Sequence, residues 1–152
     1  MRKLRVLIAD DHQGMRFTLV QALSNDFKIV DVAGDGEQLV DSAIALNPDV
    51  IVTDISMPFL SGPQALKELS AQGYDIPFVL VSVDPSGADE FIRQGASAFV
   101  DKCDIAHDLA PAVHSAALGH TYVSRTAAKR LIAYEADECP PAAVWSRATE
   151  LN

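Results

Sequence analysis

The sequence has few of the features that mark secreted and membrane-spanning chains. It contains 2 cysteines in 152 residues, Cys103 and Cys139, too few for a disulfide framework and without metal-ligand spacing, so we expect reduced thiols. The first apolar run ends after Ala9 at two acids, which is too short for a signal peptide, and no later run approaches a membrane-spanning length. The sequence therefore predicts a cytoplasmic protein without membrane contact.

Basic residues are also scarce. Lys and Arg number 12 against 21 Asp and Glu, a net charge of −9, and a surface of that sign repels phosphate backbones and anionic lipids. These residues should therefore not bind nucleic acid themselves. A composition 49% hydrophobic and 22% charged is typical of a globular chain that buries a core, which argues against disorder.

Strand and helix patterns alternate along the chain. Short runs rich in Val, Ile and Phe, bounded by Asp, Gly or Pro, predict strands at 5–9, 28–33, 50–53, 76–82 and 97–100. The stretches between them carry apolar residues at helical spacing, as at Met15, Leu19 and Leu23, and a further helix should follow Asp104. The alternation predicts an α/β fold, a doubly wound five-stranded parallel sheet with helices on both faces.

The composition changes after Leu118. Residues 119–152 contain four basic and four acidic residues, so the whole negative charge belongs to residues 1–118. Residues 126–134 could form a helix, which Cys139-Pro140-Pro141 would interrupt. We interpret residues 1–118 as one domain and 119–152 as a linker helix and tail, which is too short for a DNA-binding domain.

Polar side chains gather where the predicted strands end. Asp10 and Asp11 follow the first strand and Asp54 the third, Ser82 ends the fourth, and Lys102 follows the fifth by two residues. Each alone could be an ordinary helix cap, loop acid, strand-end hydroxyl or surface lysine. The functional crevice of a parallel α/β sheet lies beyond the carboxyl ends of its strands, so their joint placement predicts one site.

Three converging carboxylates require a cation. At about 5 Å each pair would repel by about 3 kcal/mol at an effective dielectric of about 20. Mg²⁺ suits few carboxylates, retained waters and a phosphate oxygen, and the Lys102 ammonium adds a second cation. Asp54 could attack a phosphoryl group in line and form an acyl phosphate. Mg²⁺ on Asp10 and Asp11, with Lys102, would neutralise the equatorial oxygens. Ser82 could donate a hydrogen bond to one of them.

A set of motifs accompanies these strand ends: Asp10-Asp11, Asp54 in DISMP with Gly62 eight positions on, Ser82 after VLV, and Lys102 after GASAFVDK. Over residues 4–118 the set resembles the receiver domain of two-component response regulators. The resemblance implies a flavodoxin-like fold with strand order 2-1-3-4-5. It also implies that a histidine kinase or phosphotransfer protein phosphorylates Asp54, and that Asp10, Asp11, Asp54 and the Ser56 carbonyl hold Mg²⁺. The chain would then catalyse only its own phosphorylation and dephosphorylation.

A conformational switch is part of the same resemblance. Phosphate would draw Ser82 inward, and the Phe99 ring would rotate into the vacated space, changing the face formed by the fourth helix, fifth strand and fifth helix. The alternative for Phe99 is a plain core aromatic. Homodimerisation through the fourth or fifth helix is a further expectation from the resemblance. Val83 departs from the small residue usual after Ser82 and could narrow the site.

The segments DDHQGMRFTL and PAVHSAALGHTYVSRTAAKRL resemble LuxR-type transcriptional regulators, in which a DNA-binding domain follows the linker. DNA contact is thus expected only through a domain absent from this chain, and the alternative is a receiver that acts through protein contacts alone. The histidines lack acidic or glycine context for phosphotransfer and are interpreted as structural or surface residues: His12, His107, His114 and His120.

Other classes fit less well. A flavodoxin-like cofactor binder needs a hydroxyl- and glycine-rich loop after the first strand, where this chain has the acidic DDHQGM. A phosphatase of the haloacid dehalogenase type needs a DxD pattern and usually a cap domain. The remaining alternative is a degenerate receiver that serves as a phosphorylation-independent interaction module.

Overall fold

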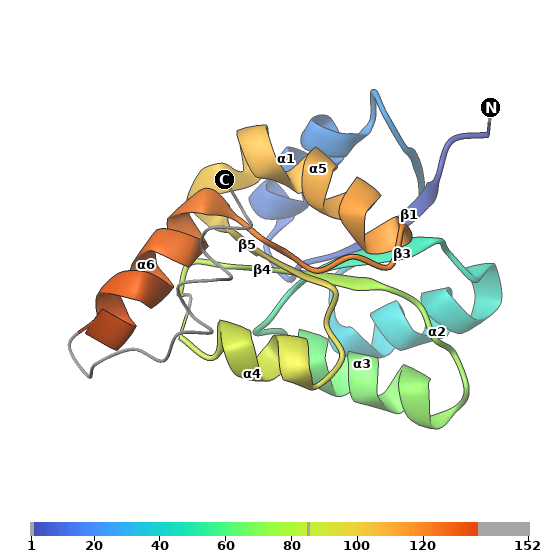
Figure 1. Cartoon of the computed structure of the whole chain (residues 1–152). Helices are drawn as coiled ribbons and strands as arrows, with labels where there is room; N and C mark the ends of the chain where they lie inside the picture. The colour runs from blue at the N-terminus through green and yellow to red at the C-terminus, as the bar shows by residue number, and fades with distance from the viewer. Residues whose placement is uncertain (1, 85, 137–152) are drawn as a thin grey trace.

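The computed structural model describes residues 2–84 and 86–136, in which strands and helices alternate (Figure 1). The strands are β1 (Arg5–Ala9), β2 (Lys28–Ala33), β3 (Val50–Asp54), β4 (Phe78–Ser82), β5 (Ala98–Asp101) and β6 (Tyr122–Val123). The helices are α1 (Gln13–Leu23), α2 (Gly36–Leu46), α3 (Gly62–Ala71), α4 (Ala88–Arg93), α5 (Ile105–Ala117) and α6 (Arg125–Ala136), with a 3₁₀ turn η1 (Lys102–Asp104) before α5. The predicted strands are thus confirmed to within two residues at each end.

The strands form one parallel sheet in the order β2-β1-β3-β4-β5-β6. The order expected for the first five strands is confirmed, and β6 is an addition that the sequence did not predict. Ala9 lies opposite Thr53, and Ser82 lies opposite Asp101. Because parallel strands in register end together, the residues that follow them meet at one edge of the sheet.

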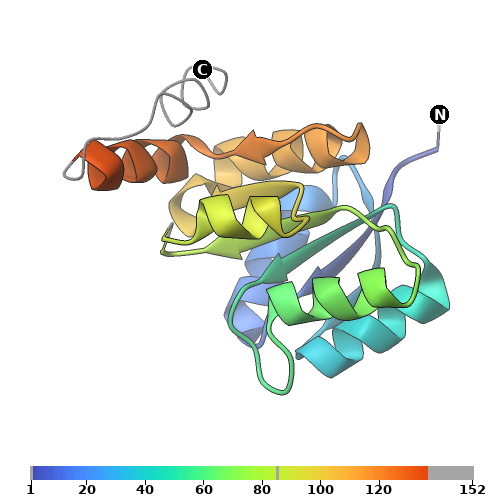
Figure 2. The ribbon, with the colours of Figure 1, turned by 60° about the horizontal axis from the view of Figure 1, so that its bottom comes forward.

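Helices cover both faces of the sheet. Helices α1 and α5 lie on one face (Figure 1), and α2, α3 and α4 lie side by side on the other, turned forward in Figure 2. Successive residues along a strand point to opposite faces of the sheet. Leu7 and Ile51 pack with α2 and α3, whereas Ile8 and Val52 pack with α1 and α5. All four side chains are fully buried, and each contributes about 2 kcal/mol of hydrophobic stabilisation.

The turn from β3 into α3 is tightly packed. Ser61 and Gln64 form a capping box, in which each side chain accepts a backbone N–H of the other residue. The N–H of Gly62 donates to the Ile55 carbonyl at 2.8 Å, and a Cβ on Gly62 would lie 2.5 Å from the carbonyl oxygen of Asp54. The glycine therefore lets the helix start press against the end of β3, which fixes the backbone at Asp54.

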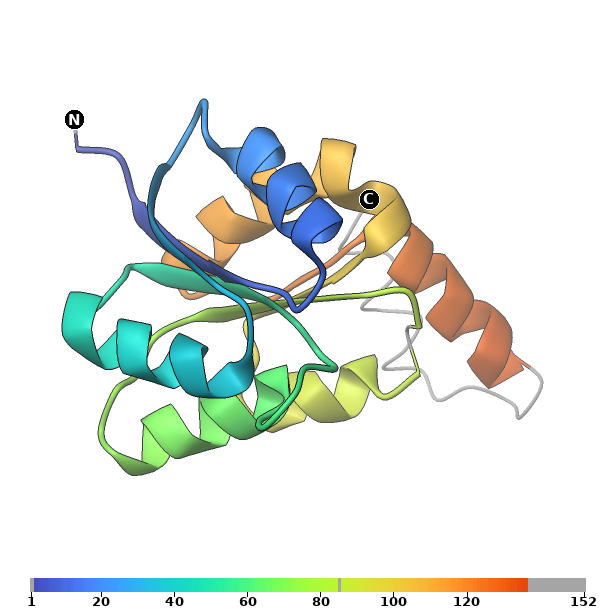
Figure 3. The same cartoon turned by 180° about the vertical axis from the view of Figure 1, so that it is seen from behind.

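The segment after α5 packs onto the β5 edge of the sheet. Phe99 of β5 pairs with Val123 of β6, and the buried Ala127 and Ala128 of α6 belong to the same hydrophobic cluster as Phe99. Helix α6 lies between α4 and α5 at this edge (Figures 1 and 3). The division at residue 118 stays a prediction, and Cys139 with the two prolines after it lies outside the described residues.

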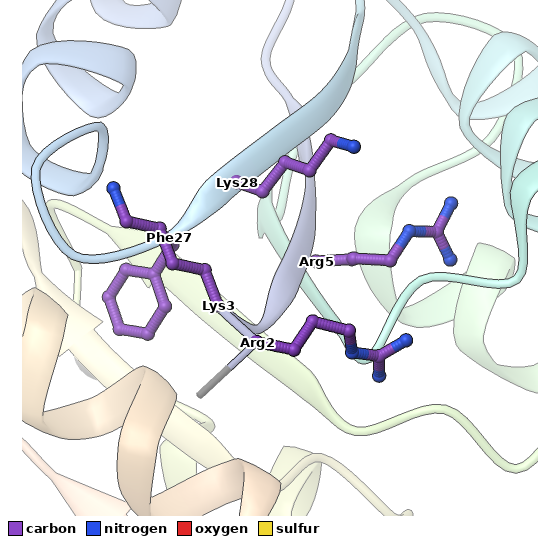
Figure 4. A pocket seen from close by; sticks show the side chains of 5 residues that line it. All are labelled: Arg2, Lys3, Arg5, Phe27 and Lys28. Carbon is purple, nitrogen blue, oxygen red and sulfur yellow. The ribbon is translucent and has the colours of Figure 1, made fainter.

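Most of the chain's early basic residues lie at the other end of the strands. Together with Phe27 they line a pocket of about 360 Å³ at the starts of β1 and β2 (Figure 4): Arg2, Lys3, Arg5 and Lys28. Arg2 pairs with Asp49 at 3.4 Å, and Arg5 donates to the Asn47 carbonyl at 3.0 Å. These cations therefore fasten the strand starts to the α2–β3 turn. Across the described ranges, no helix has the length and apolar character needed to cross a bilayer.

Candidate functional site

Three carboxylates meet at the carboxyl edge of the sheet. Asp10 and Asp11 follow β1, and Asp54 is the last residue of β3. One potential ligand atom from each of these residues and from His12 lies within 4.8 Å of the others. Asp10 is 0% exposed and Asp54 is 7% exposed, so two of the acids are removed from water. Such a grouping is costly for a fold unless positive charge is supplied.

Lys102 supplies one positive charge. Its Nζ lies 3.7 Å from Oδ2 of Asp54 and 4.0 Å from Oδ2 of Asp10. Lys102 stands in η1 directly after β5, and its long side chain crosses the strand ends to reach the acids. The structure thus brings together Asp10, Asp11, Asp54 and Lys102 from three different strand ends.

The oxygens of Asp10 have different surroundings. Oδ1 accepts a hydrogen bond from the His12 backbone N–H at 2.8 Å. Oδ2 is buried and accepts none from any described residue, and Oδ1 of Asp11 also accepts none, although a ring nitrogen of His12 lies near it. A buried carboxylate oxygen without a donor carries its full desolvation cost. Oxygen ligands of this kind fit a hard divalent cation, so Asp10, Asp11 and Asp54 could hold one.

His12 is an unexpected member of the cluster. Its Nδ1 lies 3.1 Å from Oδ1 of Asp11 and 3.4 Å from Oδ1 of Asp10. His12 precedes α1, but its side chain makes no capping hydrogen bond and turns to the acids instead. From the sequence, His12 is interpreted as a structural or surface residue like the other three histidines. Its position directly after Asp10-Asp11 was the available signal.

Burial is the main influence on Asp54. It raises the pKa of the carboxyl group above its ordinary value, while the Lys102 ammonium lowers the pKa and the negative charge of Asp10 raises it further. The Ile55 backbone N–H donates to Oδ1 at 2.8 Å, and Oδ2 faces Lys102. The carboxylate is therefore poorly solvated and held in one orientation, as a nucleophile aimed at a phosphoryl group should be.

The other predicted residues lie at a strand end, in loops and in the core. Ser82 is half-buried at the end of β4, and its Oγ accepts a hydrogen bond from the Asp84 N–H at 3.2 Å. Ser56 is exposed in the loop that follows Asp54. Phe99 is 0% exposed within the core, and its rotation stays a prediction. Val83 is exposed on the loop after Ser82.

The fold and the cluster define an α/β protein with a group of carboxylates at the carboxyl edge of a flavodoxin-like sheet. The family model for the response regulator receiver domain matches residues 6–114. The chain belongs to this family.

Two curated proteins and one solved structure are similar to much of this chain. Transcriptional regulatory protein DegU of Brevibacillus brevis is 32% identical over 134 residues, which are 86% of this chain and 57% of DegU. The nitrate/nitrite response regulator protein NarL of Escherichia coli is 32% identical over 123 residues, 78% of this chain and 57% of NarL. The crystal structure of the response regulator domain of Thermotoga maritima CheB has a TM-score of 0.72 at 32% identity, covering 77% of this chain and 98% of that domain.

These likenesses bear out the expected kinship with LuxR-type regulators. The chain spans a little over half the length of DegU and NarL. The match to the CheB domain concerns its response regulator part.

Proposed function

We propose that the chain accepts a phosphoryl group on Asp54 from the phosphohistidine of a histidine kinase or phosphotransfer protein. One observation carries the proposal: a buried carboxylate at a strand end with Lys102 Nζ 3.7 Å from Oδ2 and two further acids within 4.8 Å. Membership of the receiver family supports the same reaction. The chain would act on itself rather than on a separate substrate.

The reaction would be an in-line displacement. An oxygen of Asp54 attacks phosphorus, the new O–P bond forms as the P–N bond of the phosphohistidine breaks, and the departing imidazole takes up a proton. Lys102 would pair with a phosphoryl oxygen, and the Ser82 hydroxyl would donate to another. The transfer would replace the single negative charge of Asp54 with the two charges of a phosphoryl group, so the Lys102 ammonium and a divalent cation would be needed to stabilise the product.

Mg²⁺ is the proposed cofactor. Asp10, Asp11 and Asp54 would hold it with the Ser56 carbonyl, and it would offset repulsion between these acids and the incoming phosphoryl oxygens. The buried Oδ2 of Asp10, which no described residue hydrogen-bonds, supports this assignment. His12 stands close enough to affect the affinity for the ion.

The proposed output is transcriptional control. It rests on the similarity to DegU, a transcriptional regulatory protein that is longer than this chain. DNA contact would then belong to a part of the protein outside these residues, in keeping with the formal charge of −9. Homodimerisation remains an accompanying proposal.

Phosphorylation by a small donor tests the reaction. The chain is incubated with acetyl phosphate and Mg²⁺, and intact mass spectrometry should show one added phosphoryl group, which hydroxylamine removes as expected for an acyl phosphate. Asp54→Asn should remain unmodified, and Asp49→Asn, a carboxylate at the far end of β3, should react like the parent chain. Modification of the Asp54→Asn chain would refute the assignment. A parent chain that stays unmodified, with phosphohistidine donors as well, would favour the degenerate interaction module.

A further inference from the structure

Arg130 of α6 joins the two segments that carry Ser82 and Lys102. Its Nη1 donates to the Val83 carbonyl at 3.0 Å and to Oδ2 of Asp101 at 2.9 Å. Val83 directly follows Ser82, Asp101 directly precedes Lys102, and Ser82 and Asp101 face each other in the β4–β5 register. One nitrogen atom therefore ties together the ends of the two strands that deliver the hydroxyl and the ammonium group to the site.

The Asp101 side of this contact is buried. The Asp101 side chain is 1% exposed, and its Oδ1 accepts from the Cys103 backbone N–H at 2.9 Å. The Asp101 N–H in turn donates to the buried Ser124 Oγ at 2.9 Å. Removing Arg130 would leave Asp101 as a buried charge without its cation, a much larger loss than that of a solvent-exposed ion pair.

Helix α6 is itself fixed in place by two acids of η1 and α5. Asp104 accepts from the backbone N–H of Thr126 at 2.8 Å and from its hydroxyl at 2.6 Å. Asp108 accepts from the Arg125 N–H at 2.9 Å and from the Tyr122 hydroxyl at 3.0 Å. The first turn of α6 is thus held in place by hydrogen bonds before the chain reaches Arg130. The Arg130 side chain therefore extends from a helix whose position is fixed.

The loop after β4 has bonds of a different kind. The Asp84 N–H donates to Ser82 Oγ, and the Ser86 N–H donates to Oδ1 of Asp84 at 2.9 Å. Both are local turn bonds, which hold the loop's shape but do not fix its place on the protein. The contact between Arg130 and the Val83 carbonyl ties the loop to another element.

We propose that Arg130 is a positioning residue for phosphoryl transfer to Asp54, and that docked α6 and the phosphoryl group on Asp54 stabilise each other through it. The proposal rests on the function proposed above. Holding Ser82 and Lys102 in place lowers the entropic cost of gathering them around the phosphoryl group. Because coupling between two binding events is reciprocal, a phosphoryl group that engages both residues also favours the docked position of α6.

Three variants of the full chain test whether Arg130 positions the site for phosphoryl binding. Beryllofluoride with Mg²⁺ serves as the phosphoryl mimic, and its affinity is measured by calorimetry on chains checked for folding by circular dichroism. Arg130→Met should bind about tenfold more weakly, which equals about 1.4 kcal/mol. Arg130→Lys should keep most of the affinity, because both contacts come from one nitrogen that an ammonium group can replace. Lys129→Met, an exposed change on the same helix with the same loss of charge, should bind like the parent.

Hydrogen exchange tests whether the phosphoryl group stabilises the docked position of α6. In the parent chain the mimic should slow amide exchange across α6, and in Arg130→Met it should not. Equal mimic affinity in the parent and Arg130→Met, a folded Arg130→Lys chain as weak as Arg130→Met, or α6 exchange unaffected by the mimic in the parent would each overturn the coupling while leaving Asp54 as the acceptor. A parent chain that binds no mimic would overturn the proposed function as well.

Discussion

Asp54→Asn should stabilise the folded chain when divalent cations are absent. At separations within 4.8 Å, Asp10 and Asp11 each repel the Asp54 charge by about 3.5 kcal/mol at an effective dielectric of about 20. Lys102, at 3.7 Å, attracts the Asp54 charge by about 4.5 kcal/mol. The repulsion from the two acids therefore exceeds this attraction by about 2.5 kcal/mol. Asp11 is partly exposed and screened by solvent, which reduces the expected gain to about 1–2 kcal/mol.

The gain should depend on pH in a defined direction. Burial raises the pKa of Asp54 in the folded chain above the ordinary value of 3.8. Between the two pKa values the folded state binds more protons than the unfolded state, so stability falls as pH rises through this window. The penalty is complete once the pH exceeds the raised pKa, and the asparagine variant escapes it there. The advantage of the variant should shrink as the pH falls through the raised pKa toward 3.8.

Urea unfolding followed by circular dichroism measures the effect, with a chelator present, at neutral and at mildly acid pH. Asp84→Asn is the matched control: a hydrogen bond from the Ser86 backbone N–H lowers the pKa of this exposed carboxyl, so the substitution should bring no gain. Adding Mg²⁺ should stabilise the parent more than Asp54→Asn. An asparagine variant no more stable than the parent at neutral pH, or a gain that acid leaves unchanged, would refute the electrostatic reasoning.

Three further predictions concern the surroundings of the site. Gly62→Ala should lower the free energy of unfolding by about 1–3 kcal/mol, because the alanine Cβ would lie 2.5 Å from the Asp54 carbonyl oxygen. An unchanged free energy in urea unfolding would contradict that contact. Asp108→Ala should cost about 2–4 kcal/mol by leaving the Tyr122 hydroxyl and the Arg125 N–H without their acceptor, and hydrogen exchange should rise over β6 and α6 rather than in α2. Burial, with a smaller contribution from the Asp108 bond, raises the pKa of Tyr122 to about 12. Stability should therefore fall as pH rises from 10 to about 12, and absorbance titration against Tyr122→Phe should show no tyrosinate from this residue near pH 10.

The central part of the fold could be predicted because its signals are local. The runs at β1, β3 and β4 are continuous in Val, Ile, Leu or Phe, as strands buried on both faces must be, and Asp, Gly or Pro bounds them. The strand order came from the family resemblance, since periodicity does not specify which strands are neighbours. β6 was missed because a two-residue strand has no period. Its place depends on the β5 edge and on Asp108, both distant in sequence.

The site likewise has residues that the sequence could predict and one that it could not. The convergence of Asp10, Asp54 and Lys102 follows from strand ends in a parallel sheet, which sequence position alone can suggest. Arg130 could not be predicted, because its role depends on where α6 lies. The segment after Leu118 is neutral by charge count, yet its Arg130 pairs with the buried Asp101 of the sheet. The net charge of a segment therefore does not show whether its charged residues pair with residues elsewhere in the chain.

The packing around Phe99 changes what a switch in this protein would involve. Phe99 is fully buried, its carbonyl accepts the Ser124 N–H at 2.9 Å, and Ala127 lies in the same cluster. A rotation of the ring would therefore displace β6 and the start of α6, since close-packed interiors do not offer an empty place for a phenyl ring. Such a change is a rearrangement between two packed arrangements, not a side-chain flip at a free surface. The face formed by α4, β5 and α5 would then signal through α6, whose Arg130 bonds to the residues next to Ser82 and Lys102.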